Sequence, residues 1–123
     1  MTQRLTAVLA SDLLFTSRLT EPAARASISL VRVDDPDQLP PAGDVALLIV
    51  DWGARRSDWA DRIVAWRDAG AAADAGTTRI VLVGPHVDLK AHAEARAAGL
   101  GPMIGRSRLM SLLPELFPSG GGV

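Results

Sequence analysis

Polar side chains that could do chemistry follow four apolar segments of this sequence. Asp51 ends the run VALLIVD, Ser11 and Asp12 follow LTAVLA, His86 comes after VLVGP, and Arg106 follows MIG. A carboxylate can accept a phosphoryl group, a metal ion or a proton, an imidazole changes charge near neutral pH, and a guanidinium pairs with carboxylates or phosphates. Together these groups could form a ligand site or an active site. Taken singly, Asp51 could also be only the point where a buried strand meets water.

Five short runs rich in aliphatic residues predict β-strands. They cover residues 5–9, 28–33, 45–50, 80–83 and 103–104. The first, third and fourth runs are continuously apolar, as expected of strands buried on both faces of a parallel sheet. The second alternates more and predicts a less buried strand.

Helical patterns separate most of these strands. Residues 57–68 give the clearest one, with Trp59, Ile63 and Trp66 spaced as one apolar stripe. Other helices are predicted after a cap at Ser11 or Asp12, over residues 88–99 and over residues 107–117, and the prolines inside the first and last predict kinks or early ends. Trp59 and Trp66 are expected in the core, whereas Trp52, next to Asp51, is expected at the surface.

Alternating strands and helices predict an α/β domain with a doubly wound parallel sheet. Residues 34–44, with three prolines and a glycine, predict a loop or a short helical turn where another helix would be expected. One domain is expected over residues 1–118, followed by a flexible tail over residues 119–123. Ligands of such sheets bind at the carboxyl ends of the strands, and the polar residues above lie there.

Composition excludes several classes of function. The 123 residues carry a net charge of −1, which does not favour nucleic-acid or membrane partners, and cysteine is absent, so disulfides and thiolate chemistry are excluded. The start of the chain does not resemble a signal peptide, so a cytoplasmic location is expected. A phosphate-binding GK[ST] loop, a dinucleotide-binding glycine motif and a GxSxG serine-hydrolase motif are all missing.

Two segments resemble the receiver domain of bacterial response regulators. LLIVDW places Asp51 where that family carries its phosphoacceptor aspartate, and AEARAAGLGPMIGRSR is similar to its fourth helix and fifth strand, with Arg106 in place of the lysine. The resemblance covers most of residues 4–117. It implies a three-layer α/β/α flavodoxin-like fold with a five-stranded parallel sheet in the order 2-1-3-4-5.

The sequence departs from the receiver pattern around Asp51. The two acidic residues that help a receiver hold Mg²⁺ are replaced by Ala10 and Ser11, with Asp12 nearby, and the hydroxyl residue after the fourth strand is Gly84. A small hard cation needs several oxygen ligands, so phosphorylation should be poor. Arg106 could instead form a permanent ion pair with Asp51.

The leading hypothesis is a stand-alone degenerate receiver, or pseudo-receiver, that binds other proteins and is neither an enzyme nor dependent on a cofactor. Its partner is unknown; the resemblance assigns the contact to residues 88–117, through which a homodimer could also form. One alternative is a working response regulator phosphorylated on Asp51, for which Mg²⁺ would be needed. The other is a small-ligand-binding protein or enzyme using Asp12, Asp51, His86 and Arg106, with His86 facing Asp51 across the crevice.

Overall fold

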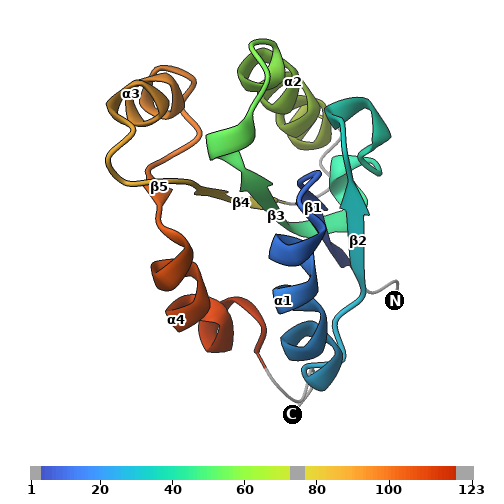
Figure 1. Cartoon of the computed structure of the whole chain (residues 1–123). Helices are drawn as coiled ribbons and strands as arrows, with labels where there is room; N and C mark the ends of the chain where they lie inside the picture. Colours follow the sequence, from blue (N-terminus) through green and yellow to red (C-terminus); the bar gives the residue numbers. More distant parts are fainter. Residues whose placement is uncertain (1–3, 73–76, 119–123) are drawn as a thin grey trace.

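The five predicted strands lie side by side in one parallel sheet (Figure 1). In the computed structural model, which describes residues 4–72 and 77–118, the sheet order is β2-β1-β3-β4-β5. The strands are β1 (Leu5–Leu9), β2 (Leu30–Val33), β3 (Val45–Asp51), β4 (Arg79–Val83) and β5 (Met103–Ile104). The predicted doubly wound sheet and its order are therefore confirmed. The second strand is shorter than predicted because residues 28 and 29 precede the paired segment.

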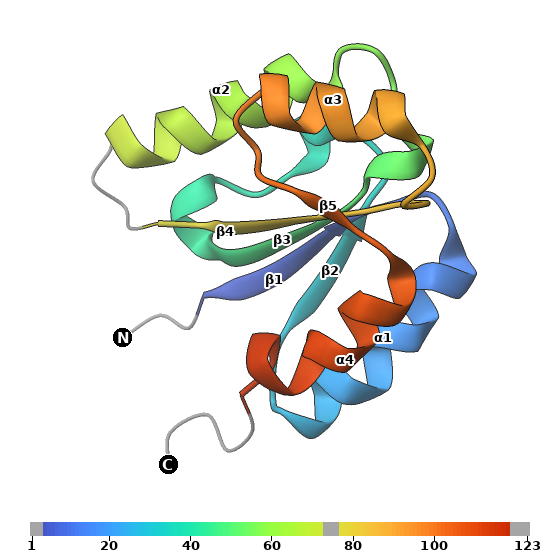
Figure 2. The ribbon, with the colours of Figure 1, turned by 90° about the vertical axis from the view of Figure 1, so that its left-hand side faces the viewer.

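Four α-helices in the described residues cover the sheet on both faces (Figure 2). They are α1 (Leu13–Arg25), α2 (Trp59–Ala72), α3 (Leu89–Ala97) and α4 (Arg106–Leu116). Helices α1 and α4 lie on one face, and α2 and α3 lie on the other, which gives three layers. Neither proline ends its helix early, since α1 continues to Arg25 beyond Pro22 and α4 continues to Leu116 beyond Pro114.

Successive residues of the central strands point to opposite faces and so build two cores. In β3, Leu48 and Val50 pack in the cluster under α2 and α3, whereas Leu47 and Ile49 pack in the cluster under α1 and α4. This two-residue period is the normal geometry of a strand. It explains why the run is continuously apolar, since each face needs its own set of buried side chains.

Residues 34–44 form two 3₁₀ turns, Pro36–Gln38 and Ala42–Asp44, as the proline-rich sequence predicted. Arg62 of α2 holds the first turn by ion pairs with Asp35 at 2.7 Å and with Asp37. At the second, a Cβ on Gly70 would lie 2.5 Å from the Cβ of Ala42. Two short turns therefore stand where a helix would be expected between β2 and β3, and both contact α2.

The structure also bears on membrane insertion and on the predicted tail. Within residues 4–72 and 77–118, no helix has the length and apolar character needed to cross a bilayer. The predicted flexible tail, residues 119–123, lies outside the described residues. The division into a domain over residues 1–118 and a tail therefore stays a prediction.

Candidate functional site

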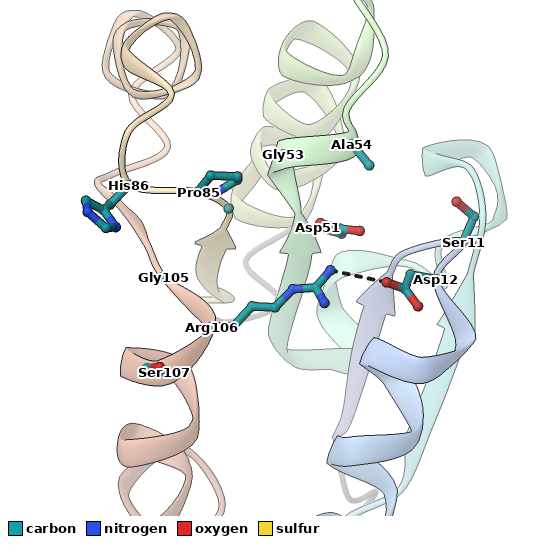
Figure 3. Close-up of a pocket in the computed structure, with 11 residues that line it drawn as sticks. Ser11, Asp12, Asp51, Gly53, Ala54, Pro85, His86, Gly105, Arg106 and Ser107 are labelled. Atoms are coloured by element: carbon teal, nitrogen blue, oxygen red, sulfur yellow. Dashed lines mark hydrogen bonds and ion pairs between the residues drawn. The ribbon is translucent and has the colours of Figure 1, made fainter.

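A cleft of about 760 Å³ lies at the carboxyl edge of the sheet (Figure 3). All six residues proposed from the sequence line it: Ser11, Asp12, Asp51, Gly84, His86 and Arg106. They meet because β1, β3 and β4 run parallel and end together, with Leu9 beside Val50 and Asp51 beside Val83. The sequence prediction of where the site lies agrees with this cleft.

Asp51 forms part of the cleft wall. It is the last residue of β3 and shares the strand face of Leu47 and Ile49, so its carboxylate points to the α1 and α4 side. Its exposed fraction is only 6%, yet no group in residues 4–72 and 77–118 donates a hydrogen bond to its carboxylate. The Asp51 oxygens are not among the fully buried unpaired side-chain atoms, of which Trp59 Nε1 is the one found in the described residues, so water in the cleft reaches them.

Arg106 pairs with Asp12 and not with Asp51. Its Nη2 donates to Asp12 Oδ2 at 3.2 Å, and its guanidinium stacks 4.9 Å from the ring centre of Phe15. Figure 3 shows the side chain reaching across the cleft from the start of α4 to the start of α1. The predicted Arg106–Asp51 ion pair is therefore wrong, because Asp12 projects from the opposite wall and lies within reach of the guanidinium.

Asp12 is held in place by its own helix. As the N-cap of α1 it accepts hydrogen bonds from the backbone N–H of Leu14 at 2.9 Å and of Phe15 at 3.1 Å. The Phe15 N–H, followed by the hydrogen bond from Arg106, lowers the pKa of Asp12 below its ordinary value. Asp12 therefore remains charged and committed to two roles, capping the helix and binding Arg106.

Burial has the opposite effect on Asp51. Removal of its carboxylate from water raises the pKa of Asp51; the positive charge of Arg106 works against this shift, and the negative charge of Asp12 adds to it. The two aspartates of the cleft are thus distinct. One is a stable anion with partners, and the other is a buried carboxylate whose charge is incompletely compensated.

His86 does not face Asp51. It is exposed on the loop after β4, and Figure 3 shows its ring turned away from the carboxylate. Its backbone oxygen is instead 2.9 Å from Nε2 of His92 on α3. The predicted contact between His86 and Asp51 is therefore wrong, because the loop turns outward to reach the N-cap Asp88 of α3.

Gly84 lies where neighbouring segments approach closely. A Cβ at this position would lie 2.7 Å from Met103 Sδ, 3.0 Å from the backbone nitrogen of Gly53 and 3.2 Å from its Cα. Separations this short require neighbouring atoms to move. The neighbours of Gly84 therefore leave little room for the side chain of a hydroxyl-bearing residue at this position after β4.

Trp52 is a core residue that the sequence analysis wrongly expected at the surface. It is fully buried, and its Nε1 donates to the backbone oxygen of Ala91 in α3 at 2.9 Å. Arg55 stacks 5.3 Å from its ring centre and pairs with Glu94 of α3 at 2.6 Å. The sequence carried a usable signal, since Trp52 continues the alternation of the buried Leu48 and Val50.

The carboxylates of the cleft are a poor match for a divalent cation. Only Asp12 and Asp51 line it, and no group of three or more His, Cys, Asp or Glu side chains suited to a metal occurs within the described residues. Asp12 is already engaged by Arg106 and by two backbone N–H groups. Mg²⁺ needs several oxygen ligands, and this donor set supplies few.

We expect Asp51→Asn to be more stable than the wild-type protein near neutral pH. The raised pKa means that the folded state holds the Asp51 proton more tightly than the unfolded state. The wild-type protein therefore gains stability below the ordinary aspartate pKa of 3.8 and loses it as the pH rises through the raised pKa. Urea denaturation of both proteins from acid to neutral pH should show a difference that grows with pH.

Asp12→Asn provides the control, with the opposite sign. Its lowered pKa contributes stability above the ordinary aspartate value, and that contribution is lost as the pH falls through the folded-state pKa. The variant should therefore be less stable than wild type at neutral pH and close to it in acid. Equal stability of Asp51→Asn and wild type across the whole pH range would contradict the prediction.

Comparison with known proteins supports the fold. No protein-family model matches the chain, and no curated protein matches it. Among solved structures, the chain is similar to one in the co-crystal structure of the Saccharomyces cerevisiae histidine phosphotransfer signaling protein Ypd1 and the receiver domain of its downstream response regulator Ssk1. The TM-score is 0.68 at 10% identity, covering 94% of this chain and 90% of that chain. Together with the sheet order, this likeness shows a receiver-like, flavodoxin-like α/β fold.

Proposed function

We propose that this chain is a receiver-like signalling module that works by binding other proteins, without Mg²⁺-dependent phosphorylation of Asp51. The observation that carries the proposal is the ion pair between Arg106 and Asp12 beside Asp51. It engages the second carboxylate of the cleft, which a metal ion next to Asp51 would need as a ligand. The module is neither an enzyme nor dependent on a cofactor.

The packing around Gly84 supports the same proposal. In the receiver family, which the sequence resembles, a hydroxyl residue after the fourth strand hydrogen-bonds the phosphoryl group. Here that position is a glycine whose missing Cβ space is filled by Met103 and the Gly53 backbone. A phosphoryl group on Asp51 would therefore find no hydroxyl there to bind.

A protein partner is proposed from the fold likeness. The structurally similar receiver was crystallised together with a histidine phosphotransfer signaling protein. The present chain has that fold and a cleft in which Asp51 accepts no hydrogen bond from the described residues. Signalling through contact is the role that these features support best, with the fold contributing only by analogy.

The proposal is tested by exposing the protein to acetyl phosphate and Mg²⁺ and measuring its intact mass. We expect no phosphate-sized mass gain, because the cleft offers few ligands for the metal. A receiver with a complete acidic site, treated in parallel, shows that the reagent is active. A mass gain that disappears in Asp51→Asn would overturn the proposal and establish a phosphorylated response regulator.

A further inference from the structure

All four large hydrophobic side chains that are exposed in the described residues gather at one end of the molecule. Their exposed fractions are 64% for Leu13, 76% for Leu14, 75% for Val87 and 77% for Leu89. Single exposed apolar residues are common on soluble proteins and need no explanation. Four from two separate segments at one edge of the sheet indicate a contact surface.

The segments that carry these side chains border the cleft on two sides. Leu13 and Leu14 directly follow the cleft residue Asp12, and Val87 and Leu89 follow the cleft residue His86. Figure 2 shows the start of α1 and the loop from β4 to α3 at the same edge of the sheet, on opposite faces. A partner wider than the cleft would therefore span both segments. These four residues are called the cleft rim below.

The cleft between them carries one unbalanced negative charge. Arg106 pairs with Asp12 at 3.2 Å and its charge also acts on Asp51, so the three side chains together carry a net charge of one negative unit. Asp51 is left as a carboxylate that is 6% exposed and accepts no hydrogen bond from any described residue. A group that donates hydrogen bonds and carries positive charge is the complement of such a site.

The lining of the cleft favours a side chain over a free small molecule. Apart from the charged residues, the wall is built largely from small or polar residues: Ser11, Gly53, Ala54, Gly84, Gly105 and Ser107. Small-molecule sites are usually lined by hydrophobic and aromatic side chains that enclose the ligand. Here the large apolar side chains lie outside the cleft, on the rim. They suit a partner that is wider than the cleft and sends one group into it.

We infer that the cleft and its rim form a docking site for a partner protein, which places a basic side chain against Asp51 and covers the rim with apolar residues. This inference rests on the proposed function and names the contact surface and the chemistry of the partner. The basic side chain supplies the hydrogen bonds that Asp51 lacks, and the apolar contacts supply burial. No group is transferred in this contact.

The docking site differs from the surface that the sequence analysis assigned to a partner. Within residues 88–117, Leu89 is the single exposed large hydrophobic residue among those described, and it belongs to the cleft rim. The other three rim residues lie outside that range. Contact through residues 88–117 and a homodimer remain predictions, whereas the rim has the stronger support from exposure and charge.

Synthetic peptides provide the test. One peptide carries a central arginine flanked by leucines, a second replaces the arginine with its neutral analogue citrulline, and a third replaces the leucines with serines. Binding is measured by calorimetry, with n-butylguanidinium as the small cation. We expect the first peptide to bind at least about tenfold more tightly than each of the other probes, because it alone offers both charge and apolar area.

Variants of the protein locate the contact. Asp51→Asn should weaken binding of the arginine peptide about tenfold and leave the affinity for the citrulline peptide unchanged. The double variant Leu14→Ser with Leu89→Ser should weaken binding of both leucine-flanked peptides. Asp68→Asn is the matched control, because Asp68 is an exposed carboxylate on α2 and does not line the cleft.

The inference is overturned if the arginine and citrulline peptides bind equally, if Asp51→Asn binds like wild type, or if no leucine-flanked peptide binds. Equal binding of n-butylguanidinium and the arginine peptide would also overturn it, in favour of a small-cation site. Each of these outcomes leaves the phosphorylation-independent module standing. A phosphate-sized mass gain on Asp51 in the acetyl phosphate experiment would instead remove the proposed function itself.

Discussion

Replacing Trp52 with alanine is expected to destabilise the protein by about 3–5 kcal/mol, the largest effect of any single change proposed for this chain. The side chain is fully buried, so its removal leaves a cavity between β3 and α3. The hydrogen bond from its Nε1 to the Ala91 oxygen is lost at the same time. Urea denaturation monitored by circular dichroism measures the change in the free energy of unfolding.

Two further variants separate packing from hydrogen bonding. Trp52→Phe keeps most of the volume and loses the Nε1 donor, and should cost about 1–2 kcal/mol. Trp66→Ala is the matched control, because Trp66 also donates its Nε1, to the Pro40 oxygen at 2.7 Å, but is only partly buried. Its cost should be clearly smaller than that of Trp52→Ala. Because each alanine variant loses one hydrogen bond, a larger cost at Trp66 would show that burial does not set the difference between them.

Gly84→Ser is expected to destabilise the protein by about 2–3 kcal/mol and to leave it unable to accept a phosphoryl group. The new Cβ would be placed 2.7 Å from Met103 Sδ and 3.0 Å from the Gly53 nitrogen. The methionine side chain can move, but Gly53 meets the new atom with its backbone. The serine hydroxyl therefore restores one receiver-like group at the expense of the local packing.

Gly105→Ser is the control for Gly84→Ser, because it makes the same chemical change in the same cleft. A Cβ at Gly105 meets nothing within 4 Å, and Gly105 is the N-cap of α4, a position where serine is favoured. This variant should be as stable as wild type or slightly more stable. If the two serine variants have equal stability, close packing does not explain the glycine after β4.

Two separate features shape the surroundings of Asp51. The ion pair of Arg106 with Asp12 and the packing at Gly84 are separate features of the same cleft. Restoring a single receiver-like residue therefore changes only one of them. In the inferred docking site, Asp51 serves as the recognition group for a basic side chain.

Much of the fold followed from the sequence alone. The apolar runs fix the strands because each face of a parallel sheet needs its own buried residues, and alternation with helices then requires crossovers in one sense. The carboxyl ends of these strands meet at one edge, so the sequence also located the cleft residues. Proline content likewise predicted a loop or a short helical turn over residues 34–44, where the structure has two 3₁₀ turns, because proline leaves too few backbone donors for a longer helix.

Contacts within the cleft were decided by tertiary structure. The sequence placed Asp12, Asp51, His86 and Arg106 near one another but could not rank the pairs they form, because side-chain reach and direction depend on how α1, α4 and the loop after β4 are oriented. Arg106 at the start of α4 pairs with Asp12 because Asp12, the N-cap of α1, lies on the opposite wall of the cleft. Among the described residues, none donates a hydrogen bond to the Asp51 carboxylate, because its strand face turns it into the cleft wall and the loop after β4 turns His86 away from it.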